Sequence, residues 1–254
     1  MNPVRMQFIR DKLHEIAADE DTSTSLQPDQ VLNGLDVLDV GCGGGLLTES
    51  LARMNARTTG IDASKSNISI ATLHAQADPR LRDSGNINYL HTSAETLLDQ
   101  PKRYDVVCSM EVLEHVDNPS QFLATCAELV KPGGHLFLST ISRTPLAYAL
   151  TILMTEEILQ NVSRGTHTYS KFVKPSELVQ FFREYRSSST GPNSSSALKP
   201  WITTPASANY IPRTEAELRG LIYNPLAARW HLAPRDAWGA LECNYIFWVR
   251  KPKN

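Results

Sequence analysis

Short apolar runs and longer amphipathic segments alternate along most of the chain. The apolar runs have the length and the β-branched content of strands, whereas the segments between them carry apolar residues at helical spacing. The predicted strands are 36–40, 57–62, 87–91, 104–109 and 135–140, and the predicted helices are 2–18, 46–54, 64–77, 120–130 and 175–185. Segment 78–86, which contains Pro79 and Gly85, is predicted to be a loop. This alternation predicts an α/β fold with a mostly parallel sheet and right-handed crossovers.

The alternation of predicted strands and helices ends after residue 140. Two further runs, Glu215–Tyr223 and Cys243–Val249, predict late strands that form an antiparallel hairpin on the edge of the sheet. They bring the predicted sheet to seven strands. The Ser-rich segment 186–200 predicts a flexible insertion. With no internal repeat and no sign of a second unit, residues 1–254 are predicted to form a single domain.

Segment 145–174 is predicted to be an insertion that carries an apolar helix. Leu150, Met154, Ile158 and Val162 recur at every fourth position, so one face of a helix over 145–162 is apolar. Such a helix is too short to span a bilayer. Two interpretations stay open: a helix packed on the domain, or a lid that faces a membrane and guards an apolar substrate.

Composition narrows the function classes. The chain has 254 residues and a net charge of −2, so it has no general electrostatic attraction to nucleic acid. The four cysteines are scattered without a C-x-x-C pair, which argues against a zinc site or a disulfide framework. No apolar run has the length of a membrane span. The first residues already resemble folded domain, so we expect any targeting segment to be missing from this sequence.

The stretch 37–45 (Val-Leu-Asp-Val-Gly-Cys-Gly-Gly-Gly) predicts a strand that runs into a glycine turn before a helix. Its glycines follow G-x-G-x-G, with Leu46 where a dinucleotide fingerprint has its third glycine, and no P-loop lysine is present. Asp62 ends the next strand, where a carboxylate accepts hydrogen bonds from ribose hydroxyls. Gly41, Gly43 and Asp62 therefore predict a site for a nucleoside without pyrophosphate, most simply S-adenosylmethionine. The alternative is an ordinary glycine turn, with Asp62 at a helix N-terminus.

A second polar cluster follows the strand 104–109. Glu111, Glu114 and His115 form E-x-x-E-H, and if this turn is helical the three side chains converge on one point. Two carboxylates and an imidazole are typical of a divalent cation site. The alternative is a solvated helix face with a hydrogen-bonded histidine at the rim. A phenol that accepts a methyl group must lose its proton, so His115 could act as the base, or a bound cation could lower the phenol pKa.

These motifs resemble the class I S-adenosylmethionine-dependent methyltransferases. Four further segments resemble one family within that class, the ubiquinone biosynthesis O-methyltransferases, in particular their mitochondrial members. The four segments are Met1–Arg5, Gly165–Phe172, Lys174–Leu178 and Gly220–Trp230. The resemblance covers nearly the whole chain.

The resemblance implies a Rossmann-like fold and the O-methylation of polyprenylated dihydroxybenzoate and demethylubiquinol-type intermediates. It implies that S-adenosylmethionine contacts Arg5, Gly41, Asp62 and Met110, although the pattern alone predicts Arg5 to be a surface charge. It implies that Glu111, Glu114 and His115 hold Mg²⁺, with His115 and Glu114 as the catalytic residues. It further implies a peripheral protein on the matrix side of the mitochondrial inner membrane, within a multi-enzyme complex. An O-methyltransferase for another small phenolic or lipid substrate is the alternative.

Overall fold

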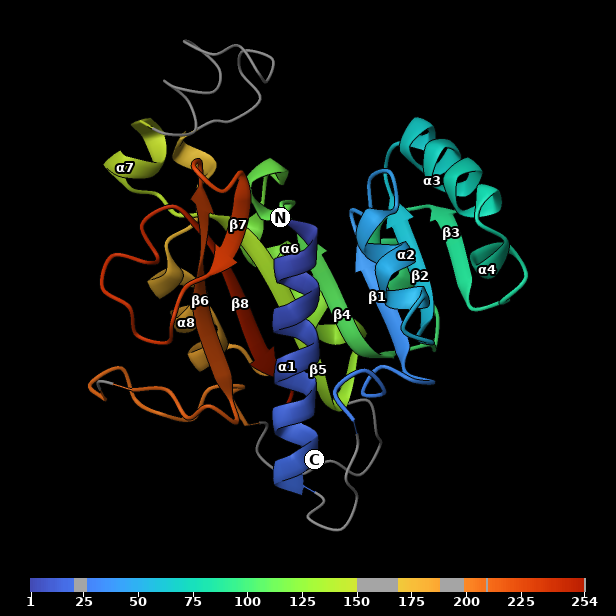
Figure 1. Ribbon diagram of the computed structural model, residues 1–254. Coiled ribbons are helices and arrows are strands. Elements are labelled where there is room, and N and C mark those ends of the chain that lie inside the picture. Colours follow the sequence, from blue (N-terminus) through green and yellow to red (C-terminus); the bar gives the residue numbers. More distant parts are fainter. Residues whose placement is uncertain (21–26, 150–168, 188–198, 209, 254) are drawn as a thin grey trace, which may run out of the picture.

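A computed structural model describes residues 1–20, 27–149, 169–187, 199–208 and 210–253 (Figure 1). The apolar helix predicted within 145–162 lies outside these residues from Leu150 onward, as do residues 163–168 and most of the predicted insertion 186–200. None of the described helices is long and apolar enough to cross a bilayer.

The fold is built on one eight-stranded sheet with the order β3-β2-β1-β4-β5-β8-β6-β7. The strands are β1 Asp36–Val40, β2 Arg57–Asp62, β3 Ile87–His91, β4 Tyr104–Met110, β5 Val130–Ile141, β6 Ala216–Asn224, β7 Arg229–Leu232 and β8 Asn244–Arg250. The strands β1 to β5 are parallel, whereas β8 is antiparallel to both β5 and β6. This confirms the α/β class and the antiparallel late strands.

Two details of the predicted sheet were wrong. The sheet has eight strands because the short strand β7 pairs antiparallel with β6 and forms the edge hairpin. The strand β8, predicted to lie at the edge, instead lies between β5 and β6. An antiparallel strand with two apolar faces satisfies the same sequence pattern in either place, so the pattern did not distinguish the two positions.

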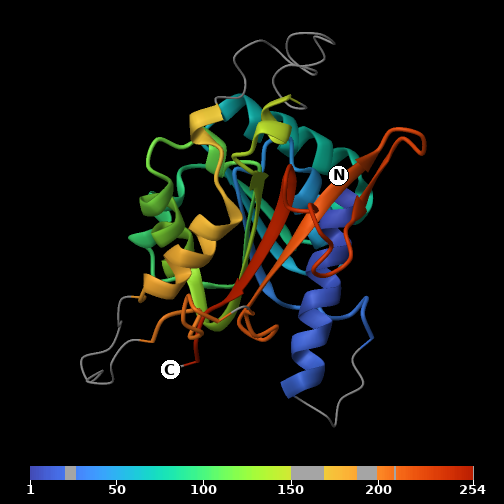
Figure 2. The same cartoon turned by 90° about the vertical axis from the view of Figure 1, so that its left-hand side faces the viewer.

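Helices cover both faces of the sheet (Figures 1 and 2). The helices are α1 Asn2–Glu20, α2 Leu46–Ala52, α3 Lys65–Ala77, α4 Pro79–Arg82, α5 Ala94–Leu98, α6 Pro119–Leu129, α7 Pro145–Tyr148 and α8 Pro175–Glu184, with 3-10 turns η1 Leu113–His115 and η3 Tyr169–Lys171. Of the two largest core clusters, one joins α1 and α2 to the sheet and the second joins α5, α6 and α8 to it. The helix α4 corrects the loop predicted at 78–86, because Asp78 caps it and Pro79 begins it.

Local chemistry fixes where the elements near the site begin. The Ser64 hydroxyl accepts a hydrogen bond from the Asn67 amide at 3.3 Å and caps α3, as the sequence predicted. Gly45 begins α2 with φ of +85°, a conformation that glycine adopts without steric cost. The parallel strands β1, β2 and β4 all end on the same edge, which we call the carboxyl edge. Polar residues that follow these strands therefore gather there.

Candidate functional site

The glycine turn joins β1 to α2 at the carboxyl edge. The amides of Gly41 and Cys42 both donate to the Ile61 carbonyl, at 2.8 and 2.9 Å, which ties the turn to the end of β2. Gly41 has φ of +74°, and a Cβ there would lie 2.4 Å from the Val112 side chain. Gly43 has φ of +54°, but a Cβ there would meet nothing within 4 Å. The turn is thus packed against the segment that follows β4 at one glycine and is open to a ligand at the other.

Asp62 closes the turn from β2. Its Oδ2 accepts a hydrogen bond from the Gly43 amide at 2.9 Å. Its Oδ1 accepts from the Ser64 amide at 2.8 Å and from the Asn67 side chain at 3.3 Å. The residues predicted from sequence spacing are therefore in direct contact. A carboxylate accepts about four hydrogen bonds, so Asp62, which already accepts three, can accept about one more from a ribose hydroxyl while its orientation is fixed.

Arg5 reaches the same edge from the first turn of α1. Its Nη2 lies 2.7 Å from the Glu111 carboxylate, and the side chain is only 13% exposed. The prediction of a surface charge, drawn from the apolar pattern, was therefore wrong. Its Nε is buried without a hydrogen-bond partner, whereas Nη2 is taken up by the ion pair with Glu111. Because an unsatisfied buried donor costs about 1–3 kcal/mol, this guanidinium is suited to an anionic ligand group.

The helical geometry assumed for the E-x-x-E-H segment was wrong. Glu111 has φ of +57°, and the short 3-10 turn η1 begins only at Leu113. The Glu111 amide donates to the Ser139 carbonyl at 2.9 Å, so the residue continues the pairing of β4 with β5 rather than starting a helix. The i, i+4 relation between Glu111 and His115 that would bring three ligands together is absent.

Each carboxylate of this segment has its own partner on β5. The Ser139 hydroxyl donates to Glu111 at 2.7 Å, and the Thr140 hydroxyl donates to Glu114 at 2.7 Å. Glu114 is 4% exposed, and burial, reinforced by the charge of Glu111, raises its pKa to about 7 against the opposing effect of the Thr140 hydrogen bond. His115 is exposed to solvent.

These three side chains do not fit a divalent cation in this arrangement. Among the described residues no group of three or more His, Cys, Asp or Glu side chains is placed to hold a metal ion. Glu111 is paired with Arg5 and accepts from Ser139, and Glu114 accepts from Thr140, so each carboxylate is already held by protein groups.

Met110, which the sequence predicted as a site residue, ends β4 and is buried opposite Ser139. Three other residues that shape this site, Asp39, Ser139 and Thr140, were not predicted. Ser139 and Thr140 hold the two carboxylates, and buried Asp39 accepts a 2.6 Å hydrogen bond from Thr48 beneath the glycine turn. Burial raises the pKa of Asp39 to about 6. The available signals were an acid inside an apolar strand and two hydroxyl residues at the end of another.

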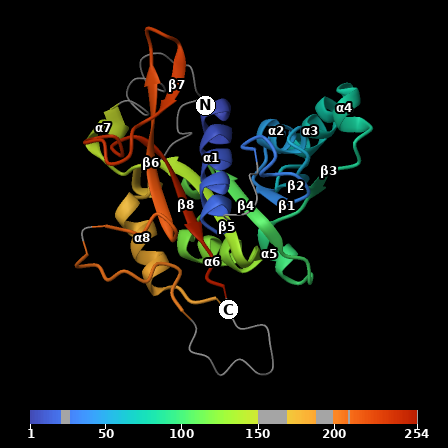
Figure 3. The ribbon, with the colours of Figure 1, turned by 60° about the horizontal axis from the view of Figure 1, so that its bottom comes forward.

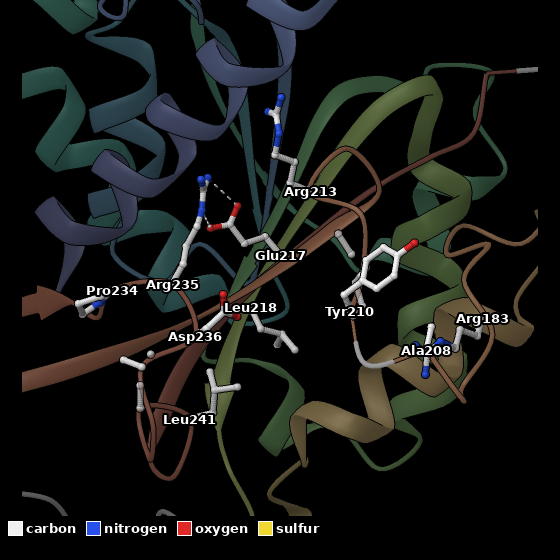
Figure 4. Close-up of a pocket in the computed structure, with 15 residues that line it drawn as sticks. Arg183, Ala208, Tyr210, Arg213, Glu217, Leu218, Pro234, Arg235, Asp236 and Leu241 are labelled. Atoms are coloured by element: carbon white, nitrogen blue, oxygen red, sulfur yellow. Dashed lines mark hydrogen bonds and ion pairs between the residues drawn. The ribbon is translucent and has the colours of Figure 1, made fainter.

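A cavity of about 440 Å³ lies elsewhere, beside the first residues of β6 (Figure 4). None of the site residues predicted from the sequence lines it. Its wall includes the ion pair between Arg235 and Glu217, with Nε 2.9 Å from the carboxylate. Because β6 runs parallel to β5, this cavity lies toward the end of the sheet opposite the carboxyl edge. We therefore separate it from the site formed by the glycine turn.

Comparisons with known proteins agree with this geometry. A family model described as "Methyltransferase domain" matches residues 4–185. The ubiquinone biosynthesis O-methyltransferase, mitochondrial, of Schizosaccharomyces pombe is 42% identical over 221 residues, which are 87% of this chain and 70% of that protein. The ubiquinone biosynthesis O-methyltransferase of Agrobacterium fabrum is 38% identical over 99% of this chain and 84% of its own length.

A solved structure shows the same fold. The magnesium protoporphyrin IX methyltransferase of Synechocystis, crystallised with bound SAH, superposes with a TM-score of 0.53 at 17% identity, over 97% of this chain and 83% of that one. At this identity the likeness concerns the fold alone. The family rests on the closer relatives and on the domain match, and these show that the chain belongs to the ubiquinone biosynthesis O-methyltransferases.

Proposed function

We propose that the protein transfers a methyl group from S-adenosylmethionine to hydroxyls of polyprenylated dihydroxybenzoate and demethylubiquinol-type intermediates in ubiquinone biosynthesis. The observation that carries the proposal is the convergence of Arg5, Gly43, Asp62 and Glu114 on one edge of a methyltransferase sheet. The relatives' names support the pathway. The same geometry suits another small phenolic acceptor, which is the second candidate.

The residues around the glycine turn fit the methyl donor. Asp62 has acceptor capacity left for a ribose hydroxyl, and the open face of Gly43 lets the backbone approach the ligand. The unsatisfied Nε donor of Arg5 suits the carboxylate of a methionine group. When bound, S-adenosylmethionine supplies an activated methyl group on a sulfonium. Binding then requires Arg5 to exchange part of its pairing with Glu111 for the ligand carboxylate.

Glu114 is the described group best suited to remove the proton from the acceptor hydroxyl. A pKa of about 7 keeps it partly ionised at neutral pH, which is the range where a general base is most effective. The phenol has a pKa of about 10, so the proton moves to Glu114 as the oxygen gains the methyl group. The Thr140 hydroxyl fixes the orientation of the carboxylate. His115, which is exposed, provides a route for the proton to solvent.

The wider context is also proposed from relatives. Relatives from Schizosaccharomyces pombe, Dictyostelium discoideum and Arabidopsis thaliana carry "mitochondrial" in their names, whereas the bacterial relatives do not. On this basis we propose a mitochondrial protein, peripheral on the matrix side of the inner membrane. Contacts with lipid and with other ubiquinone biosynthesis proteins belong to the same proposal.

Methyl transfer to a prenylated catechol tests the function directly. The protein is incubated with S-adenosylmethionine and 3,4-dihydroxy-5-prenylbenzoate, with and without a chelator, and the methylated product is measured by mass spectrometry. We expect Glu114→Gln to lower kcat by about 10²-fold or more while binding of S-adenosylhomocysteine is kept. Glu95→Gln, an exposed carboxylate on α5, is the matched control and should leave kcat unchanged.

The outcomes separate the candidates. No transfer to any catechol, whatever metal is added, would contradict the proposed function. Equal rates with prenylated and unprenylated catechols would favour the second candidate. Complete loss of transfer on chelation, with recovery on adding Mg²⁺, would show that the three E-x-x-E-H side chains rearrange around a cation when substrate binds. Full kcat in Glu114→Gln would remove that residue as the base.

A further inference from the structure

The hairpin formed by β6 and β7 projects beyond the body of the sheet (Figures 1 and 3), and residues 225–229 at its tip are exposed in the described part of the chain. The tip, residues 224–229, has the sequence Asn-Pro-Leu-Ala-Ala-Arg. The Leu226 side chain is 99% exposed, and Ile222 and Tyr223 just below it are about half exposed. A fully exposed leucine keeps its apolar side chain in water, which is unfavourable. Burying that side chain against an apolar partner would therefore release free energy.

The side chain of Asn224 satisfies two of the backbone donors at the tip. The Asn224 side-chain oxygen accepts hydrogen bonds from the amides of Leu226 at 3.0 Å and Ala227 at 3.1 Å, and Pro225 has no amide hydrogen. The backbone of residues 225–227 therefore has no N–H group that needs a hydrogen-bond acceptor from solvent. Moving an unpaired backbone donor out of water costs several kcal/mol, so these two hydrogen bonds lower the cost of placing the tip in an apolar medium.

Below the tip the side chains change in the order expected at a bilayer surface. Arg229, exposed and opposite Asn224, is the first charge. Tyr223 and Trp230 come next as a cross-strand pair whose ring centroids are 5.4 Å apart. An apolar tip, then a cation, then paired amphipathic rings is the arrangement by which proteins place aromatic side chains at the headgroup level and basic ones against lipid phosphates.

The tip lies on the functional edge. Because β6 runs parallel to β5, its last residues are at the carboxyl edge with the glycine turn and Glu114. Other large apolar side chains are exposed on the connections that follow strands at this edge: Leu46 after β1, with 65% exposure, and Leu146 and Tyr148 after β5, with 49% and 39%. They place further apolar surface on the same edge as the tip.

We propose that the β6–β7 tip inserts Leu226 into a lipid bilayer, with Tyr223 and Trp230 at the interface and Arg229 on the headgroup phosphates. The choice of a bilayer rests on the proposed function, because a polyprenyl tail lies in the membrane while its aromatic head must reach the carboxyl edge. Insertion at this point would turn that edge toward the membrane surface, so the acceptor enters without leaving lipid.

Vesicle binding tests the insertion. The whole protein is mixed with vesicles of equal phosphatidylcholine and phosphatidylglycerol, and the bound fraction is measured by flotation. We expect Leu226→Asp to weaken partitioning by about tenfold, Leu226→Ser by less, and Leu226→Trp to strengthen it. Trp238 is the matched control: it is as exposed as Leu226 but lies on the β7–β8 loop, so Trp238→Ser should bind as the wild type does.

Three results would overturn the proposal: a wild-type protein that does not float, a Leu226→Asp variant that floats equally well, or a Trp238→Ser variant that weakens binding as much. A wild-type dimer in vesicle-free solution that Leu226→Asp dissociates would assign the tip to a second copy of the chain instead. Transfer to a water-soluble catechol is measured in parallel and should be unchanged in Leu226→Asp. Failure of that transfer in the wild type would count against the proposed function while leaving the flotation result interpretable.

Discussion

Single glycines in the turn after β1 have different physical tasks. At Gly41 the protein leaves no room for a larger residue, because the Val112 side chain fills the place where a Cβ would lie. At Gly43 the space is open, so only the positive φ and an approaching ligand restrict the residue. Both residues match the same glycine pattern, yet one serves packing and the other serves binding.

Alanine substitutions separate these two tasks. Gly41→Ala should lower the free energy of unfolding by about 2–4 kcal/mol, because it combines a clash with a left-handed conformation. Gly43→Ala should cost only about 1–2 kcal/mol but weaken binding of S-adenosylhomocysteine by at least about tenfold. Urea denaturation and calorimetry measure the two quantities.

The second substitution Val112→Ala provides the control. It should restore part of the stability lost in Gly41→Ala and have no such effect on Gly43→Ala. A Gly43→Ala variant that binds the ligand as the wild type does would contradict the division of tasks.

At this scale the sequence predicted contacts that depend on spacing and missed those that depend on an unusual backbone. Asp62 was placed correctly because the end of β2 must lie beside the turn. The geometry of Glu111 was not, because a left-handed glutamate held by the Ser139 carbonyl leaves no trace in residue order. Arg5 looked like a surface charge because its partner is more than a hundred residues away.

Among the elements, α1 is fastened to β6 by a buried charge network. The Lys12 side chain is 1% exposed, lies over the Trp248 ring at 4.7 Å, and pairs with Glu217 and, at 2.7 Å, with Glu15. Glu217 also pairs with Arg219 at 3.2 Å and with Arg235 at 2.9 Å. One carboxylate thus faces three cations, and α1, which carries Arg5, depends on it for its position.

This asymmetry predicts unequal costs for removing the two partners. Glu217→Gln leaves three cations with too little negative charge and should lower the free energy of unfolding by about 3 kcal/mol. Lys12→Met leaves Glu217 with two arginines and an apolar side chain over Trp248, so the cost should be about 1 kcal/mol or less. Urea unfolding measures both, with Glu95→Gln as a surface control. Equal costs, or the reverse order, would show that the network is not centred on Glu217.

The elements themselves were the most predictable part of the fold. The bounds of β1, β2 and β3 agree with the sequence pattern because apolar runs there are short and end at turn residues. The four-residue strand β7 escaped notice since it lies on the edge and its residues are only partly buried. The helix α4 was missed for a different reason: Pro79 was taken as the sign of a loop, whereas it is the first residue of a helix.

For the whole molecule, two buried groups oppose each other in the response to acid. Burial raises the pKa of Asp39 to about 6 and lowers that of His135 to about 3. Asp39 therefore stabilises the fold most below its unfolded pKa and loses that contribution as the pH rises through 6. The neutral His135 contributes stability above its unfolded pKa that is lost as the pH falls toward 3.

Replacing Asp39 should reveal the pH dependence of stability that His135 contributes. Asp39→Asn keeps an acceptor for the Thr48 hydroxyl, so the variant should be more stable than the wild type by about 3 kcal/mol at pH 7.5, and the difference should shrink toward zero near pH 4. Below pH 6 its stability should fall more steeply than that of the wild type, because the opposing contribution of Asp39 is gone. Urea unfolding across this pH range measures both slopes. A constant difference at every pH would contradict the shifted pKa of Asp39.

The position of β8 has a consequence for how the protein is made. Among the described strands β8 comes last along the sequence, yet it is hydrogen-bonded to β5 on one side and β6 on the other. While a ribosome is still producing the chain, β5 presents an open edge and the β6–β7 hairpin has nothing to join. The nascent chain therefore cannot close its sheet until translation has passed Arg250, and an unpaired edge of this kind is a site of aggregation. We expect a chaperone that binds exposed strand edges to be needed longest at β5.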